Sequence, residues 1–164
     1  MKTKPEDLFL QEKPVRIMRA LVEATEPMYI AGLAEAAEST YAHAFRVLEK
    51  LEILGLVKSS EQGRVRVVRL TDIGRMVASE ILRMGHLLEI VSISSSIDEI
   101  YENEIKGKLR EDIKKDAVLK KLDECIARLE EMIKKGPEEL GQTAKKVMKR
   151  AEEIGLEVKG IVLD

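Results

Sequence analysis

The sequence has almost no cysteine and few aromatic side chains. Its 164 residues contain one Cys (Cys125), no Trp and only 3% aromatic residues. A single thiol excludes a disulfide framework and an all-cysteine metal cage, and it suits a reducing compartment. Side-chain amides are also scarce, with one Asn and three Gln in a chain that is 35% charged. This composition is typical of heat-adapted proteins, so we expect a thermophilic source.

Long apolar runs and a targeting segment are absent as well. Uncharged stretches such as residues 27–34 and 90–97 are far shorter than the roughly 18 residues that a membrane helix needs. The N-terminus carries two lysines, but acidic residues follow them and no apolar run comes next, unlike a secretory signal. We therefore expect a cytoplasmic protein without a membrane partner.

The sequence also lacks an overall basic excess. Its formal net charge is −2, so total charge does not indicate nucleic-acid binding. The charge is unevenly distributed, however. Residues 1–75 hold 12 Lys and Arg against 11 Asp and Glu, whereas residues 76–164 hold 16 against 19. Residues 56–75 alone carry an excess of three positive charges, so a locally basic segment precedes an acidic second half.

Apolar spacing predicts three helices in the first third of the chain. The first begins at Pro14 and ends before Pro27, and the second covers about residues 31–38. The third begins after Ser39 or Thr40, which are both good N-caps. The expected inward faces are Val15, Met18, Leu21 and Val22, then Leu33, Ala34 and Ala37, then Ala44, Val47, Leu48, Leu51 and Leu54.

Short extended segments are expected around these helices. One lies at residues 29–30. After Gly55, which ends the third helix, residues 56–59 and 64–70 predict two strands joined by a turn at 61–63. The alternation of Arg and Val in the second strand has the period of two that is typical of a half-buried ribbon.

The second half of the chain begins with a long predicted helix. Thr71 or Asp72 caps it, and Gly107 is the next break. Its isoleucines are spaced by three, four, three and five residues, so all but the last step keep one helix face apolar. These isoleucines are Ile90, Ile93, Ile97, Ile100 and Ile105.

Two more helices and a short strand are expected after that break. A helix over about residues 109–134 has the 4-3-4 spacing of a coiled-coil seam, made of Leu122, Ile126, Leu129 and Ile133. A last helix, with Leu140, Ala144, Val147, Ala151 and Ile154 inward, ends at Gly155. Val158 and residues 161–163 predict a short terminal strand. We therefore expect residues 81–164 to form a helical dimerisation or assembly region.

The order of elements in residues 1–80 predicts a winged helix-turn-helix domain. In such a domain one helix enters the major groove of DNA, and the ribbon, or wing, reaches phosphates or the minor groove. The third helix suits this role because its outward side is polar and basic. The candidate DNA-binding residues are Thr40, Tyr41, His43, Arg46 and Lys50 on this helix, and Arg64 and Arg66 on the ribbon.

An ordered set of short motifs runs through residues 14–80. It consists of Leu33-Ala34-Glu35, Leu48 with Leu51, Gly55-Leu56-Val57, and Leu70-Thr71 with Gly74-Arg75. With this set the segment resembles the MarR/ArsR-type winged helix-turn-helix transcriptional regulators. The resemblance implies a protein that binds double-stranded DNA as a homodimer. In this chain we expect the two subunits to associate through the C-terminal helices.

The chain departs from this family in three respects. Its wing has Glu61 but lacks the Asp-x-Arg motif that is usual in MarR members. Only 13 residues precede Pro14, where those members usually carry an extra dimerisation helix. Cys125 stands alone, so the paired-cysteine metal sensing of ArsR members has no support.

Each candidate contact also has a simpler structural interpretation. Arg46 and Lys50 can be solvated helix charges beside Glu49, and the ribbon can be an ordinary exposed hairpin. His43 can be a surface side chain without a role. The ring of Tyr41 can pack against the second helix.

Catalysis, cofactors and metals find little support in the sequence. Cys125 lies on the seam side of its helix, so a buried thiol is the preferred interpretation and a redox sensor the alternative. The histidines and this cysteine share no metal-ligand spacing, and neither a phosphate loop nor a nucleophile turn is present. Residues 92–96, rich in serine, suit close helix packing, with a ligand-lined cleft between subunits as the alternative. A small-molecule effector has no other support.

Two functions remain after these exclusions. The first is sequence-specific binding of double-stranded DNA by a homodimeric transcriptional regulator. The alternative is a winged-helix adaptor that binds proteins within a larger assembly and does not bind DNA. A continuous positive surface on the third helix and the wing favours the first, whereas interruption by Glu49 and Glu61 favours the second.

Overall fold

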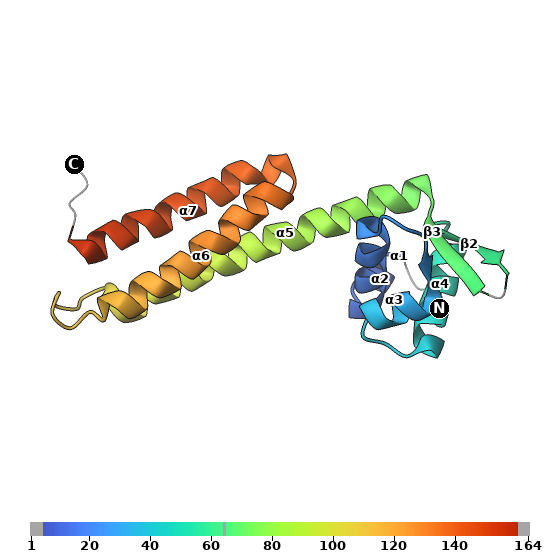
Figure 1. Ribbon diagram of the computed structural model, residues 1–164, viewed down its shortest axis with the longest axis horizontal. Helices are drawn as coiled ribbons and strands as arrows, with labels where there is room; N and C mark the ends of the chain where they lie inside the picture. The colour runs from blue at the N-terminus through green and yellow to red at the C-terminus, as the bar shows by residue number, and fades with distance from the viewer. Residues whose placement is uncertain (1–4, 64, 161–164) are drawn as a thin grey trace. The chain divides into compact units, whose positions relative to one another are not determined.

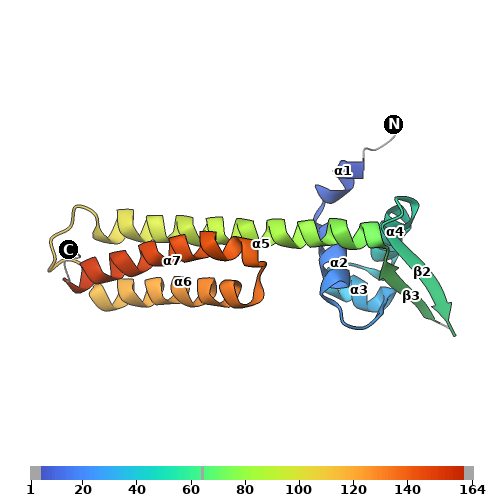
Figure 2. The same cartoon turned by 90° about the horizontal axis from the view of Figure 1, so that it is seen from above.

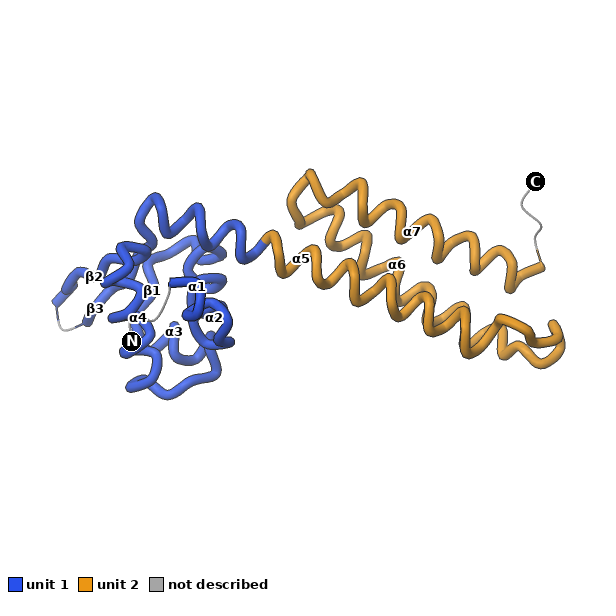
Figure 3. Tube along the Cα trace, turned by 180° about the vertical axis from the view of Figure 1, so that it is seen from behind, with its two compact units in different colours: residues 1–82 blue, residues 83–164 orange. Residues whose placement is uncertain are grey.

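The computed structural model describes residues 5–63 and 65–160. The chain divides into two compact units, residues 1–82 and residues 83–164 (Figure 3). Each unit has its own buried apolar core. The division lies close to the boundary at residue 80 that the sequence suggests. Among the described residues, no helix combines the length and the apolar character needed to cross a bilayer.

Unit 1 is a winged-helix domain, mainly α-helical with a small antiparallel sheet (Figure 1). Its elements are α1 (Pro5–Phe9), α2 (Glu12–Glu23), β1 (Met28–Tyr29), α3 (Ile30–Ala36), α4 (Tyr41–Ile53), β2 (Val57–Gln62), β3 (Val65–Leu70) and the first turns of α5 (Asp72–Ile100). The strands pair in the order β1-β3-β2. The predicted fold class is therefore confirmed, although α1 was not expected.

The β2–β3 hairpin is longer than the sequence suggests. Its register runs from Val57 opposite Leu70 to Gln62 opposite Val65, so only two residues connect the strands. Gly63 has a φ of 63°, which suits the tight turns of two-residue hairpins. The strand predicted at 56–59 therefore extends to Gln62. Arg64, which begins the predicted second strand, lies outside the described residues.

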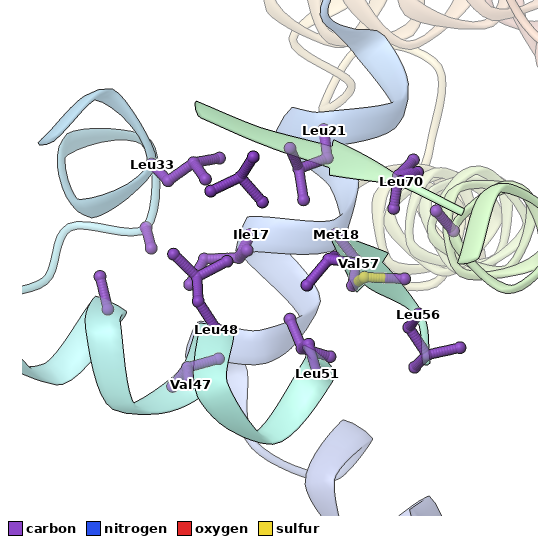
Figure 4. Packing of buried hydrophobic residues seen from close by; sticks show 14 of the residues in the cluster. Ile17, Met18, Leu21, Leu33, Val47, Leu48, Leu51, Leu56, Val57 and Leu70 are labelled. Atoms are coloured by element: carbon purple, nitrogen blue, oxygen red, sulfur yellow. The ribbon is translucent and has the colours of Figure 1, made fainter. Parts of the chain in front are cut away.

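The core of unit 1 lies between the helices and the sheet (Figure 4). Ile17 and Met18 of α2 are fully buried there and face Leu48 and Leu51 of α4. The predicted inner faces of α3 and α4 are confirmed, since Leu33, Ala34, Ala37, Ala44, Val47, Leu48 and Leu51 are all buried.

The predicted core is wrong at three points. Leu54 is 37% exposed, because α4 ends at Ile53 and Leu54 turns away as its C-cap. Ile17 was missed, and α2 begins at Glu12 rather than at Pro14. Pro14 is tolerated there because the first turn of a helix needs no backbone N–H donor at that position. In β3 the strict alternation also fails, since Val67 and Val68 are both buried.

A close backbone contact joins the end of α4 to the start of α5. Thr71 caps α5, because its Oγ1 accepts a hydrogen bond of 3.0 Å from the Gly74 N–H and donates one of 2.7 Å to the Gly55 carbonyl. A Cβ atom on Gly74 would lie 1.7 Å from the carbonyl oxygen of Leu56. Only glycine fits at this position.

Unit 2 contains the rest of α5, one π-helical turn η1 (Tyr101–Ile105), and the helices α6 (Lys115–Lys135) and α7 (Glu138–Lys159), which pack side by side (Figure 2). The predicted isoleucine face is confirmed, since Ile90, Ile93, Ile97, Ile100 and Ile105 are all buried. The five-residue step from Ile100 to Ile105 coincides with η1, whose hydrogen bonds span five residues rather than four.

Several predicted boundaries in unit 2 are wrong. Helix α6 begins at Lys115 rather than near residue 109, because Gly107 takes a left-handed φ of 72° and the chain turns before the helix starts. Helix α7 continues through Gly155, which is buried, and ends at Lys159, where Gly160 is the C-cap with a φ of 81°. Val158 is therefore a buried helical residue rather than part of a strand, and residues 161–163 lie outside the described residues.

The predicted seam of α6 is shifted by part of a turn. Leu122 and Leu129 are buried as expected, but the other buried positions are Val118 and Cys125. Ile126 and Ile133 are only half-buried and pack at the edge of the core. Ion pairs also link α5 and η1 to the α6–α7 hairpin: Arg83–Glu139, Glu89–Arg128, Asp98–Arg150 and Glu104–Lys121.

Candidate nucleic-acid-binding surface

Helix α4 begins at a capped N-terminus. The Oγ1 atom of Thr40 accepts a hydrogen bond of 3.3 Å from the His43 N–H, as an N-cap residue does. The Thr40 side chain therefore has a structural partner in addition to its predicted role. The buried residues of α4 fix the rotation of the helix about its axis, so the opposite side faces solvent.

The outer face of α4 presents the predicted side chains together. Tyr41 is 56% exposed, and His43, Arg46 and Lys50 are exposed as well. Arg46 and Lys50 are four residues apart and so lie on the same side of the helix. The surface combines two cations, an imidazole and a phenol, which can donate hydrogen bonds to phosphates or to base edges.

The acidic residues near this surface are also exposed. Glu49 lies between Arg46 and Lys50 on α4, and Glu61 lies near the tip of β2. The positive charge of the outer face is therefore not continuous. This mixture is the feature that would suit an adaptor.

The wing does not present Arg66 as a free cation. Its Nη2 atom lies 2.7 Å from Oε2 of Glu52, and its guanidinium carbon lies 5.6 Å from the ring centroid of Phe45. Arg66 is thus held against α4, which the sequence did not predict. The DNA-binding role of Arg66 stays a prediction, and that of Arg64 falls outside the described residues. Arg69 and Arg75 are both exposed.

Glu52 is the residue of this surface that sequence reasoning missed. Its Oε1 atom accepts hydrogen bonds from the Ser59 N–H at 3.0 Å and the Ser59 hydroxyl at 2.7 Å. The hydroxyl of Ser59 lowers the pKa of Glu52 most, and the backbone of Ser59 and the charge of Arg66 lower it further. Phe45 and Glu52 are seven residues apart and so share one flank of α4. This seven-residue spacing is the signal in the sequence that places Glu52 beside Phe45.

Unit 2 buries the single thiol of the chain. Burial raises the pKa of Cys125, which disfavours the reactive thiolate. Next to it, a cavity of about 330 Å³ opens between α5, η1 and α6, with Ser96, Asn103 and Lys121 on its walls. Within residues 5–63 and 65–160, the His, Cys, Asp and Glu side chains form no group of three or more that could hold a metal ion.

Comparison with known proteins identifies relatives that match part of the chain. No model of a known protein family matches it. An uncharacterised protein from Archaeoglobus fulgidus is 25% identical over 85 residues, which are 50% of this chain and 90% of that protein. The crystal structure of AF1382 from the same organism is 24% identical and covers 52% of this chain and 98% of its own, with a TM-score of 0.47.

A third similar protein carries a functional description. It is the MarR family transcriptional regulator SPO1453 from Silicibacter pomeroyi, which is 28% identical with a TM-score of 0.50. The match covers 62% of this chain and 73% of that protein. The winged-helix fold of the chain is therefore similar to that of a MarR family transcriptional regulator.

Proposed function

We propose that the protein is a homodimeric transcriptional regulator that binds double-stranded DNA in a sequence-specific manner. The observation that carries the proposal is the outer face of α4, where Tyr41, His43, Arg46 and Lys50 are exposed together on a helix whose other side is buried. The similarity to a MarR family transcriptional regulator supports the same function. The proposed protein binds DNA in the cytoplasm and needs neither catalysis nor a cofactor for this role.

In the proposed complex, α4 lies in the major groove. Its N-terminal residues, which include Tyr41 and His43, face base edges, while Arg46 and Lys50 contact phosphates. The β2–β3 hairpin contacts flanking phosphates or the minor groove. Each cation that contacts a phosphate releases counterions, so affinity falls steeply as salt rises.

The proposed dimer forms through unit 2. Met84, Leu87, Leu88 and Val91 form an exposed apolar stripe on α5, on the side away from the buried Ile90 and Ile93. A continuous exposed apolar patch on a helix is typical of an interaction surface. A second copy of the same stripe would bury it across a two-fold axis. Two copies of α4 about 34–36 Å apart would then read a palindromic site, with the acidic second half away from the duplex.

A salt series with a matched control tests the proposal. Wild type, Arg46→Ala and Arg19→Ala are titrated with a mixed-sequence duplex between about 50 and 200 mM salt. Both variants lose one exposed cation of unit 1, but only Arg46 belongs to the outer face of α4. We expect salt-sensitive binding by wild type, and a slope lower by about 1.8 for Arg46→Ala alone, because the dimer loses one phosphate contact from each subunit.

The same experiment separates the two candidate functions. If wild type shows no salt-sensitive binding at low ionic strength, the DNA proposal is wrong and the adaptor, which the exposed Glu49 and Glu61 favour, replaces it. If wild type binds, selection from a random duplex library then tests specificity, with a palindromic site as the expected product. If no sequence is enriched among the bound duplexes after several rounds of selection, sequence-specific binding is contradicted.

A further inference from the structure

A single carboxylate on α4 contacts both strands of the wing. The Oε1 atom of Glu52 accepts two hydrogen bonds from Ser59 on β2, and its Oε2 atom lies 2.7 Å from Nη2 of Arg66 on β3. Ser59 and Arg66 are not cross-strand partners, since Ser59 lies opposite Val68 and Arg66 lies opposite Glu61. The carboxylate therefore fastens the hairpin at two separate points along its length.

The contact at Ser59 also covers an open sheet edge. The sheet order is β1-β3-β2, so β2 is an edge strand and one of its sides has no strand partner. The Ser59 N–H is directed to Glu52 rather than to a strand. Edge N–H groups are otherwise left to solvent, where they restrain a hairpin little.

Arg66 is held on a second side by the same helix. Its guanidinium lies over the ring of Phe45, which shares the flank of α4 with Glu52. An ion pair and a cation–π contact thus hold one arginine of β3 against α4. Glu52 is 36% exposed and Arg66 is 38% exposed, so neither group is buried deeply enough for its charge to be costly.

We propose that Glu52 is a positioning residue that fixes the wing relative to α4, so that both elements engage one duplex at the same time. This inference rests on the proposed DNA-binding function. A hairpin held in place before binding loses less conformational freedom in the complex, which raises affinity. Glu52 itself contacts no DNA in this arrangement.

The proposal predicts that loss of a negative charge at Glu52 weakens DNA binding, which is the opposite of the electrostatic effect. Removal of a carboxylate near a polyanion lowers electrostatic repulsion, so by charge alone Glu52→Ala should bind DNA more tightly. Loss of a positioning contact has the opposite effect. Glu49→Ala is the matched control, because Glu49 is an exposed carboxylate three residues away on the same helix. It lines the same small cavity as Ser59 and Arg66, but among the described residues it forms no hydrogen bond or ion pair with either of them.

The experiment compares the full-length wild type, Glu52→Ala, Glu52→Gln and Glu49→Ala with a mixed-sequence duplex at one salt concentration. We expect Glu52→Ala to bind about five- to tenfold more weakly, because the wing must be ordered on binding. Glu49→Ala should bind equally or more tightly. Glu52→Gln should be intermediate, since its amide oxygen can still accept the hydrogen bonds of Ser59 but no longer pairs with the charge of Arg66.

Hydrogen exchange at the Ser59 amide gives a readout that does not require DNA. We expect the Ser59 amide to exchange faster in Glu52→Ala than in wild type, and at the wild-type rate in Glu49→Ala. The rates are compared under conditions in which the variants have the same free energy of unfolding. Equal or tighter DNA binding by Glu52→Ala overturns the positioning role, as does unchanged exchange at Ser59. Absence of salt-sensitive DNA binding by wild type overturns the proposed function instead, whatever the exchange at Ser59 shows. If Glu52→Ala does not fold, the comparison of Glu52→Gln with wild type and Glu49→Ala decides the test instead.

Discussion

Gly74 shows how closely two backbones can approach in this domain. A methyl group at this position would lie 1.7 Å from the Leu56 carbonyl oxygen, which belongs to the backbone and cannot rotate away. We predict that Gly74→Ala lowers the free energy of unfolding by about 3 kcal/mol, as expected for overpacking against fixed atoms. Chemical denaturation measures this difference.

Gly32→Ala is the control for this prediction. Gly32 lies inside α3, and the nearest atom to its added Cβ would be the flexible end of Met28 at 3.8 Å. Alanine is the better helix former, so this variant should be as stable as wild type or more stable by about 0.5–1 kcal/mol. Equal stabilities of the two alanine variants would show that the contact at Leu56 relaxes without cost.

Glu52 gives the wing a dependence on pH. Hydrogen bonds from Ser59 and the charge of Arg66 lower the pKa of its carboxyl in the folded state. Its contribution to stability is therefore fully present above the unfolded pKa and is lost as the pH falls through the lower folded pKa. We predict that the NMR titration midpoint of the Glu52 carboxyl lies below the ordinary glutamate range and rises in Ser59→Ala. An unchanged midpoint in Ser59→Ala would contradict the assignment of the main cause to Ser59.

Residue patterns predicted the exposed side of α4 but not the contacts across it. Tyr41, His43 and Arg46 could be placed outward because the helical period alone decides which side is buried. The pair formed by Glu52 and Arg66 could not be predicted, because the two residues meet only through the register of the hairpin against the helix. Local periodicity contains no information about that register.

At the scale of elements, the start of α5 depends on one hydroxyl. Thr71 Oγ1 accepts from the Gly74 N–H and donates to the Gly55 carbonyl, so it joins the end of α4 to the start of α5. We predict that Thr71→Ala costs about 1–2 kcal/mol of unfolding free energy, the usual effect of losing an N-cap.

Thr71→Ser separates the hydroxyl from the methyl group in this test. Serine keeps both hydrogen bonds, so the variant should recover most of the stability in the same thermal or chemical denaturation. A serine variant as unstable as the alanine variant would mean that packing of the methyl group, and not capping, is the dominant contribution.

Two glycines show why the end of α7 was predicted wrongly. Gly107 has a left-handed φ, and the helical segment ends there as the sequence suggests. Gly155 looks the same in the sequence but lies inside α7, where it is buried and its Cβ would face Leu119 at 3.8 Å. A glycine at the end of an apolar pattern can thus mark a terminus or a packed position, and only tertiary contacts distinguish the two.

At the scale of the whole molecule, the exposed stripe of α5 determines the expected assembly. Leu88 is 60% exposed at the centre of this stripe. We predict that Leu88→Glu converts the wild-type dimer to a monomer at micromolar concentration, because a charge would be buried without a partner in the interface. Light scattering coupled to gel filtration measures the mass.

A variant that adds a negative charge outside the apolar stripe provides the control for the dimer. Ser95 lies on the same face as the stripe, seven residues after Leu88, so the charge is added instead at Thr143, which is exposed on α7; Thr143→Glu should remain dimeric. A monomeric wild type would contradict the homodimer, whereas a dimeric Leu88→Glu would show that another surface joins the subunits.

The single π-helical turn also affects how the length of this chain can change. The five-residue step between Ile100 and Ile105 places both isoleucines in the core only because η1 has a wider turn. Removal of one residue from this turn would leave a four-residue step, which an ordinary α-helix also keeps on one face. Single-residue deletions should therefore be tolerated in η1 during evolution, and sequences of relatives should differ in length at this turn sooner than within α5.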